Sequence, residues 1–244
     1  HNRTHSFPTR RSSDLIVEAG LDEVVAGAVA AGRLRFVVGA ANAVGDADVV
    51  FLCVPTPQDD DGSADLSYVE AAAAEIGPLL RPGAIVVNKS TVPVGSSRVV
   101  GAVIGRDDVA VVSNPEFLRE GTAVHDFLHP DRVVIGADRR ADAEIVARLY
   151  DGVDTDLLIT DPESAETIKY VANGFLAMKV TFANAVAALC ESVGADVDDV
   201  IRGVGSDARI GSAFLRPGPG WGGSCFPKDA LALVAIADRH GYDF

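Results

Sequence analysis

The sequence has few residues of several chemically important types. Its 244 residues include only three cysteines, one tryptophan, one methionine and four lysines. An odd number of cysteines without metal-ligand spacing argues against a disulfide framework or a metal site, and favours a reducing compartment such as the cytoplasm. No uninterrupted apolar run reaches the ~18 residues of a membrane-spanning helix. The net charge of −14 disfavours nucleic acid and anionic membranes as partners.

From Ile16 onward, short apolar segments alternate with amphipathic ones. Helices are predicted at 21–31, 66–80, 96–104 and 141–150, and strands at 35–38, 49–54, 84–88, 109–113, 133–136 and 157–160. Apolar strands that alternate with helices predict an α/β fold with a doubly wound parallel sheet. No G-x-G-x-x-G turn follows any of these strands, so the sequence lacks the usual fingerprint of dinucleotide binding.

After residue 161 the pattern becomes helical. Asp161 and Pro162 begin a helix that continues to about Val193 with Gly174 as its one breaker, and a shorter helix follows at 197–204. A helix of that length is typical of a spine between domains or subunits. We therefore divide the chain into a basic, non-native or disordered tail (1–15), an α/β domain (16–161) and a helical domain with a long spine helix (162–244).

Residues 216–229, R-P-G-P-G-W-G-G-S-C-F-P-K-D, combine a glycine-rich loop with a helix start. Ser224 is a candidate N-cap and Pro227 a first-turn proline. A helix N-terminus and the ammonium of Lys228 both stabilise a thiolate, so Cys225 is a candidate nucleophile. The alternative is that Cys225 is a small core residue beside a structural turn.

Three further motifs come directly after predicted strands, at the sheet edge where open α/β sheets bind ligands. They are Val54-Pro55-Thr56-Pro57, Lys89-Ser90-Thr91-Val92-Pro93-Val94-Gly95 and Asn114-Pro115-Glu116-Phe117-Leu118-Arg119-Glu120-Gly121. The second motif offers two hydroxyls, and its glycine precedes a helix N-terminus suited to anions. Each motif could also be a plain turn or a solvated face.

Lys169 and Asn173 lie four residues apart and therefore on one face of the long helix. An ammonium and an amide directed at one point would stabilise an alkoxide or an oxyanion. The alternative is a solvated lysine on the helix surface.

Together these motifs resemble the signatures of the UDP-glucose/GDP-mannose dehydrogenase family, and the resemblance covers nearly everything from Ile16 to Phe244. It implies a partial NAD-binding Rossmann-type domain at 16–161, followed at 162–244 by a central domain that carries the catalytic cysteine loop and builds a homodimer. In the family the dinucleotide fingerprint opens the chain and a nucleotide-sugar-binding domain closes it. The resemblance thus implies a fragment that lacks both ends and is itself inactive.

The resemblance also assigns roles to residues, and none of them is a metal ligand. Catalytic roles fall to Cys225, Lys169, Asn173, Asp229, Glu116 and Thr91. Contacts with the cofactor fall to Val54, Pro55, Thr56, Pro57, Ser90, Thr91, Glu120 and Lys228. Contacts with the substrate fall to Glu116, Phe117, Leu118, Arg119, Glu120, Lys169, Asn173, Arg209, Phe214, Leu215, Arg216, Gly218, Gly220 and Gly222, although Arg119 occupies a variable slot and has no role of its own.

The implied reaction is the NAD-dependent four-electron oxidation of a nucleotide sugar, UDP-glucose to UDP-glucuronate. The C6 hydroxyl would lose its proton toward Lys169 or a water held by Asp229, and Cys225 would carry a thiohemiacetal and then a thioester. GDP-mannose and UDP-N-acetylmannosamine are alternative substrates. A second interpretation is a two-electron hydroxyacid dehydrogenase. Such an enzyme would need no nucleophilic cysteine, so Cys225 distinguishes the two. An inactive, dimerising fragment is a third interpretation, since the dinucleotide fingerprint is absent.

Overall fold

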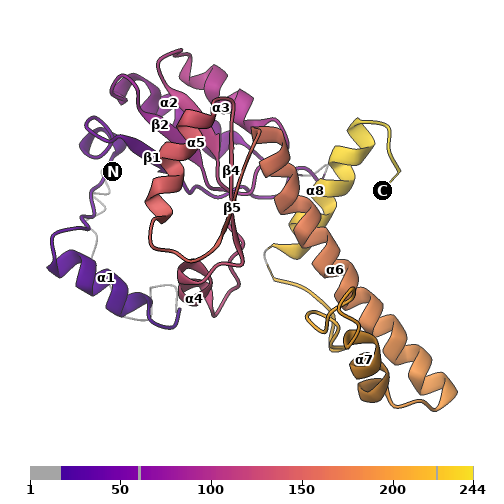
Figure 1. Ribbon diagram of the computed structural model, residues 1–244. Helices are drawn as coiled ribbons and strands as arrows, with labels where there is room; N and C mark the ends of the chain where they lie inside the picture. The colour runs from indigo at the N-terminus through magenta and orange to yellow at the C-terminus, as the bar shows by residue number, and fades with distance from the viewer. Residues whose placement is uncertain (1–17, 60–61, 224, 244) are drawn as a thin grey trace, which may run out of the picture.

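The computed structural model describes residues 18–59, 62–223 and 225–243, so the predicted tail at 1–15 lies outside the described residues. A five-stranded sheet has the order β1-β2-β3-β4-β5, and a long helix leads away from it (Figure 1). The strands are β1 (Val49–Leu52), β2 (Ile85–Asn88), β3 (Ala110–Ser113), β4 (Arg132–Ala137) and β5 (Asp156–Thr160). Five of the six predicted strands are thereby confirmed.

The direction of the strands changes once across the sheet. β1, β2 and β3 are parallel, and β4 and β5 are parallel to each other. Between the two groups, β3 pairs with β4 in the antiparallel sense, with Val112 opposite Ala137. The predicted doubly wound α/β class is confirmed, and the sheet is mixed at this one pairing.

Helices cover both faces of the sheet because alternate residues of each strand point to opposite faces. Val86 packs in one cluster with Val69 of α2 (Ser67–Ile76) and Val100 of α3 (Ser96–Ile104). Its neighbours Ile85 and Val87 pack in the other cluster, with α5 (Arg140–Ala147). Short 3-10 turns, η3 (Gly77–Leu79) and η4 (Arg148–Tyr150), extend α2 and α5. The core therefore lies in two apolar layers on either side of the central strands.

The N-terminal segment holds α1 (Leu21–Ala30) and η2 (Ala40–Asn42) but no strand at 35–38. The predicted strand there is wrong: Phe36 is 72% exposed and Val38 is 62% exposed. Apolar residues form a strand only where a neighbouring strand can pair with them, and none of the described strands does so here. Glu18 ties this segment to the sheet, since its carboxylate accepts the N–H groups of Gly121 and Ala123 beside α4 (Ala123–Leu128).

The long helix α6 (Pro162–Val193) begins against β4. Asp161 caps it by accepting the N–H of Ser164 at 2.7 Å, and Gly194 ends it in the left-handed conformation. A Cβ on Gly136 of β4 would lie 2.6 Å from the Cβ of Ala165, so glycine is required for this close approach. The first turns of α6 are therefore fixed to the sheet.

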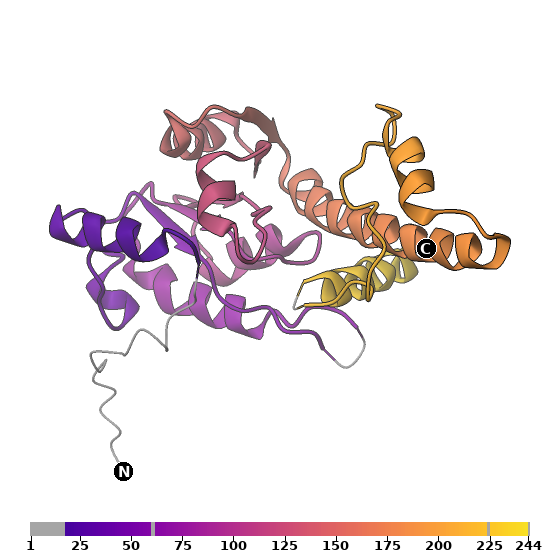
Figure 2. The ribbon, with the colours of Figure 1, turned by 90° about the horizontal axis from the view of Figure 1, so that it is seen from below.

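Two helices lie along α6 outside the sheet, α7 (Val197–Gly205) and α8 (Phe226–Arg239) (Figure 2). A Cβ on Gly174 of α6 would lie 3.0 Å from Leu233 of α8, so these two helices also approach closely. α8 thus brings the end of the glycine-rich loop back to the part of α6 that is nearest the sheet.

One side of α6 is apolar and exposed. The exposed residues are Val171, Phe175, Met178, Phe182, Leu189 and Val193. Among the described helices, α6 is the one that is long and apolar enough to cross a membrane by length and composition. Of its most apolar 18-residue stretch, 17% is buried. This corrects the expectation that no segment is apolar over a membrane-spanning length, because that expectation counted uninterrupted runs only.

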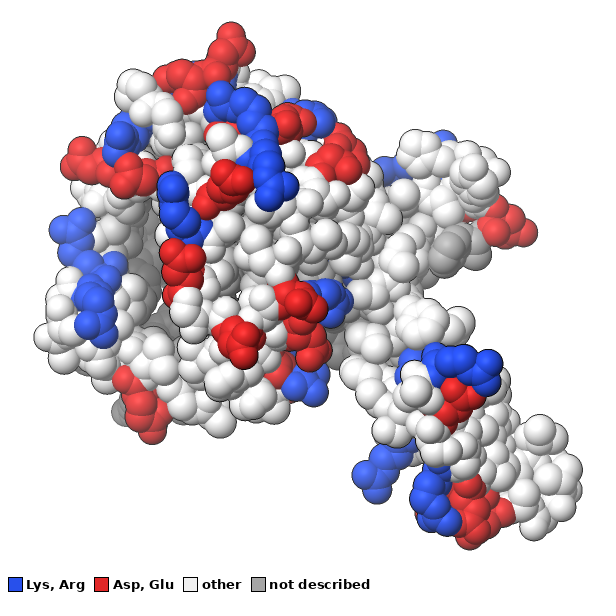
Figure 3. All heavy atoms as spheres, viewed as in Figure 1, with Lys and Arg blue, Asp and Glu red and all other residues white. Residues whose placement is uncertain are grey.

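The charged side chains show no single dominant sign on the face seen in Figure 3. There, Lys and Arg side chains lie interspersed with Asp and Glu side chains over the sheet domain. Charges of both signs recur on the projecting part of the molecule formed by α6 and α7. This face carries no extended basic surface of the kind that binds nucleic acid.

Candidate active site

A cavity of about 1040 Å³ lies between the sheet edge, the first turns of α6 and the loop before α8. Several residues predicted from the sequence line it, namely Glu116, Phe117, Leu118, Arg119, Lys169, Asn173 and Phe214. Phe226, the first residue of α8, also lines it. The loop after β3, the spine helix and the glycine-loop helix thus converge on one site.

Lys169 is buried and ion-paired inside this site. Its side chain is 4% exposed, and its Nζ donates to Glu116 Oε1 at 2.9 Å. The second carboxylate oxygen of Glu116 accepts the Leu118 N–H at 2.6 Å, which fixes the loop. The ring of Phe117 lies 5.5 Å from the Lys169 ammonium and 4.0 Å from the Arg132 guanidinium. The interpretation of Lys169 as a solvated surface lysine is therefore wrong.

Asn173 joins α6 to α8 through a buried carboxylate. Its amide donates to Asp229 Oδ2 at 2.6 Å, and Asp229 is 0% exposed. The ammonium of Lys228 lies 3.1 Å from the other oxygen of Asp229 and 3.5 Å from the hydroxyl of Thr56. The first turn of α8 is therefore connected both to the face of α6 that carries Asn173 and to the turn after β1.

The turns after β1 and β2 are bound to each other. Thr56 donates its hydroxyl to the carbonyl of Thr91 at 2.8 Å, and Ser90 donates to the carbonyl of Val54 at 2.6 Å. Pro55 and Pro57 remain exposed at this edge. The motifs predicted to contact the cofactor thus form one surface, with Lys228 beside it.

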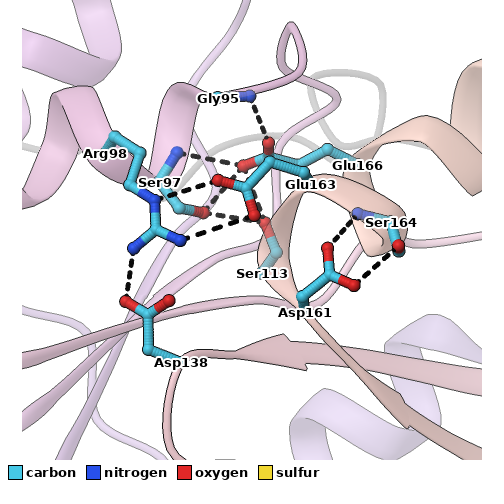
Figure 4. Close-up of polar contacts among 9 residues, drawn as sticks. All are labelled: Gly95, Ser97, Arg98, Ser113, Asp138, Asp161, Glu163, Ser164 and Glu166. Atoms are coloured by element: carbon cyan, nitrogen blue, oxygen red, sulfur yellow. Dashed lines mark hydrogen bonds and ion pairs between the residues drawn. The ribbon is translucent and has the colours of Figure 1, made fainter.

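The N-terminus of α3, which we expected to be open to an anion, already holds one. Glu166 of α6 accepts the N–H groups of Gly95 at 2.6 Å and Ser97 at 2.9 Å (Figure 4). The hydroxyls of Ser97 and Ser113 also donate to it, and Glu166 is 3% exposed. Burial raises the pKa of Glu166, and these four hydrogen bonds act against that rise. The expectation of an open anion site at Gly95 is therefore corrected: the dipole of α3 is complemented by the chain's own carboxylate.

On the exposed side of this contact, Arg98 of α3 donates to Glu163 at 2.9 Å and to Asp138 at 2.5 Å (Figure 4). The three side chains are 40–59% exposed, so these pairs add little stability individually. They nevertheless hold α3 and α6 together at the same end as Glu166.

The glycine-rich loop lies along α6. Gly218 donates its N–H to Asn184 Oδ1 at 2.8 Å, and the Trp221 indole donates to Thr181 at 2.8 Å. These two α6 residues were missed from the sequence because their partners follow 34 and 40 positions later. Gly220 has a φ of 107°, which only glycine adopts readily, and Gly222 is exposed.

Cys225 lies where expected, immediately before the first residue of α8, and it is exposed. The predicted N-cap of α8, Ser224, lies outside the described residues. Cys225 does not itself line the cavity, although its neighbour Phe226 does. The placement agrees with a thiol at a helix N-terminus rather than in the core.

Four other predicted residues differ in their surroundings. Arg209 pairs with Asp207 at the surface and does not line the cavity, and Arg216 is exposed. Leu215 is 2% exposed and belongs to the packed interior. Glu120 is exposed at the rim of its loop. Within this chain, therefore, Arg209 and Arg216 are not brought to the cavity that Lys169 lines.

No separate role was predicted for Lys89, but the structure places it in the cavity wall. Its Nζ donates to Asn114 Oδ1 at 3.1 Å and lies 3.2 Å from the Tyr150 hydroxyl. Tyr150 also donates to Asn114, at 2.5 Å. None of the described carboxylates forms an ion pair with Lys89, and burial lowers its pKa to about 8. The result is a partly buried lysine whose hydrogen-bond partners are neutral.

The depressed pKa of Lys89 predicts a pH-dependent stability. Between pH 8 and pH 10.5 the unfolded chain binds this proton more tightly, so stability should rise with pH, by up to about 3 kcal/mol. Lys89→Met should remove this rise and stabilise the chain at pH 7. Urea denaturation at pH 7 to 9.5 measures the free energy of unfolding of the parent chain and the variant. Lys179→Met serves as the control, since Lys179 donates to backbone carbonyls near the surface. The same rise in both variants would contradict the assignment.

Residues 9–154 match the sequence model of the UDP-glucose/GDP-mannose dehydrogenase family, NAD binding domain, and residues 163–244 match that family's central domain. The UDP-glucose 6-dehydrogenase of Rhizobium meliloti is 53% identical over 236 residues, which cover 92% of this chain and 54% of the relative.

Solved structures agree with the sequence relatives. A UDP-glucose dehydrogenase from Pyrobaculum islandicum superposes with a TM-score of 0.89 at 43% identity, over 93% of this chain and 55% of that one. A GDP-mannose dehydrogenase from Pseudomonas aeruginosa superposes with a TM-score of 0.75 at 35% identity, over 92% and 54%. The chain spans about half the length of the relatives it matches. It belongs to the UDP-glucose/GDP-mannose dehydrogenase family.

Proposed function

We propose that this chain is the catalytic half of an NAD-dependent enzyme that oxidises UDP-glucose to UDP-glucuronate. The observation that carries the proposal is the convergence of two hydrogen-bonded pairs, Lys169 with Glu116 and Asn173 with Asp229, on one turn of α6. The helix that supplies Asp229 begins directly after Cys225. A cation, an amide, a carboxylate and a thiol at one helix junction are the groups that alcohol oxidation with covalent capture requires.

The first half-reaction converts the C6 alcohol to an aldehyde. The hydroxyl gives up its proton to a water beside Asp229, while C6 loses a hydride. Lys169 and Asn173 stabilise the negative charge that develops on oxygen. The burial of Lys169 strengthens this effect because the local dielectric is low.

The second half-reaction passes through Cys225. Its sulfur adds to the aldehyde carbon to give a thiohemiacetal, which loses a second hydride and becomes a thioester. Water near Glu116 and Thr91 then attacks the thioester, releasing the carboxylate and the thiol. Covalent attachment explains how one site can oxidise twice without releasing the aldehyde.

The cofactor NAD, when bound, accepts one hydride in each half-reaction. The residues present fit its reactive end: the joined turns at Val54–Pro57 and Ser90–Thr91 form one exposed edge beside the Lys228 ammonium. The N-terminus of α3 does not fit a pyrophosphate, because Glu166 already accepts its N–H groups. We therefore assign these turns to the nicotinamide end alone.

We propose further that the active enzyme is a cytoplasmic homodimer formed through α6. The exposed residues Val171, Phe175, Met178 and Phe182 recur at spacings of four, three and four, as in a helix seam that packs against another helix. A contiguous exposed apolar surface of this kind is typical of an interface. Sedimentation at the mass of a single chain would contradict the dimer.

The experiment uses a hybrid enzyme in which this chain replaces the matching half of the Rhizobium meliloti relative. We expect two NADH for each UDP-glucose consumed and UDP-glucuronate as the product. GDP-mannose and UDP-N-acetylmannosamine serve as the competing substrates and should react far more slowly. One NADH per sugar with release of an aldehyde would contradict four-electron chemistry, and a preference for GDP-mannose would contradict the substrate.

A further inference from the structure

A second, very small cavity lies between the end of β2, the turn that follows it and the first turns of α6. About 10 Å³ of it is open to the centre of a water molecule, which is roughly what one buried water needs. Its wall consists of Asn88, Ser90, Thr91, Val92, Ser113, Pro115, Glu166 and Lys169. The volume suits a single water, and the wall, although partly apolar, includes polar residues that offer it hydrogen-bonding groups.

The side chain of Asn88 makes no hydrogen bond with any described residue. It is 1% exposed, and neither its Oδ1 nor its Nδ2 has a partner. Asn114 is equally buried, yet its Nδ2 donates to the Val134 carbonyl at 2.8 Å and its Oδ1 accepts from Tyr150. Because a buried polar group without a partner is costly, the Asn88 amide requires one that the protein does not supply.

Lys169 borders the same cavity and has hydrogen-bonding capacity to spare. An ammonium has three N–H donors, and among the described residues Lys169 donates one hydrogen bond, to Glu116 at 2.9 Å. The face of Phe117 lies near the ammonium but takes no conventional hydrogen bond. Its side chain is only 4% exposed, so little of the ammonium faces the large cavity that Lys169 also lines.

We propose that this cavity is a binding site for one ordered water that bridges the Asn88 amide and the Lys169 ammonium. The water would accept an N–H of Lys169 and donate to Asn88 Oδ1. Buried waters typically make about three hydrogen bonds, and the carboxylate of Glu166 and the hydroxyl of Thr91 border the same space. Asn88 is then a positioning residue: through the water it fixes the lysine that the proposed function assigns to the oxyanion.

The water site itself is tested on the chain as it is. In ¹⁵N-labelled protein, water-to-amide NOE and ROE spectra should show a long-lived water beside the side-chain NH₂ of Asn88. The NH₂ of Asn114 serves as an internal control and should show none, since its partners are protein atoms. The Asn88→Leu chain, with folding verified by its amide spectrum, should lose the water signal from neighbouring amides. Absence of the Asn88 signal in the parent chain would overturn the site.

The positioning role is tested in the hybrid enzyme with two variants of matched size, Asn88→Ala and Asn88→Ser. We expect Asn88→Ala to lower kcat about tenfold while KM changes by less than about threefold. Asn88→Ser keeps a hydroxyl toward the water and should retain most of the parental kcat. Equal kcat values for both variants would overturn the positioning role. Failure of the parental hybrid to oxidise UDP-glucose would instead overturn the proposed function, and the NMR result would still decide the water site.

Discussion

In the hybrid enzyme, Cys225→Ser is expected to abolish conversion of UDP-glucose to the acid, with a loss in kcat of at least about 10³-fold. A serine hydroxyl is a much weaker nucleophile than a thiolate, so the aldehyde would not be captured for the second oxidation. Binding of the nucleotide should change little, because Cys225 lies at the start of α8 and does not line the large cavity. Stopped assays of NADH and UDP-glucuronate, with calorimetry of UDP-glucose binding, measure both effects.

Cys53→Ser is the matched control for this variant. Cys53 is also an exposed cysteine, but it directly follows β1. Its sulfur is partly buried, and this partial burial raises the pKa of its thiol rather than favouring a thiolate. We expect near-parental turnover from it. Release of two NADH per sugar by Cys225→Ser at a near-parental rate would contradict the covalent mechanism.

The second large effect is expected from Lys169→Ala, which should lower kcat by roughly 10²–10³-fold, as loss of an oxyanion donor does. KM should change far less, since the charge that Lys169 stabilises develops mainly in the transition state. The same substitution leaves the Glu116 carboxylate without its cation, so a circular dichroism melt must accompany the kinetics. Initial rates over a range of UDP-glucose concentrations separate the two constants.

Lys179→Ala provides the control on the same helix, because its ammonium donates to the carbonyls of Ile210 and Gly211 away from the site. A rise in KM alone for Lys169→Ala would assign the lysine to substrate binding. An unchanged kcat would remove it from the catalytic residues.

Much of the fold could be predicted from local pattern. β2 and β3 were found within a residue because they are short apolar runs between turn residues, and α6 was found because Asp161 and Pro162 mark its start. The apolar run at 35–38 failed as a strand because pairing depends on a neighbour that the run itself does not specify. The antiparallel direction of β4 relative to β3 was missed for a similar reason, because an apolar run does not specify in which direction its strand crosses the sheet.

The site was predictable where one motif holds its own chemistry. Lys169 and Asn173 share a face by helical spacing, and their burial follows from the packing of α6. What the sequence could not show are the contacts between distant segments. Glu166 reaches the N–H of Gly95, 71 positions earlier, and Arg209 turns instead to Asp207, two positions away. Motif spacing does not distinguish a ligand-facing arginine from a locally paired one.

Because its first turns are fixed to the sheet, α6 can pivot about that end. Its 32 residues rise about 48 Å, and its pivot is the first turn, where Gly136 and Glu166 hold it to the sheet. A tilt of about 10° around that pivot would carry the far end through roughly 8 Å but Lys169 through only about 2 Å. Displacements at the exposed outer turns would therefore reach the reacting groups strongly attenuated. The residues proposed to react therefore lie near the pivot, where the helix would move least.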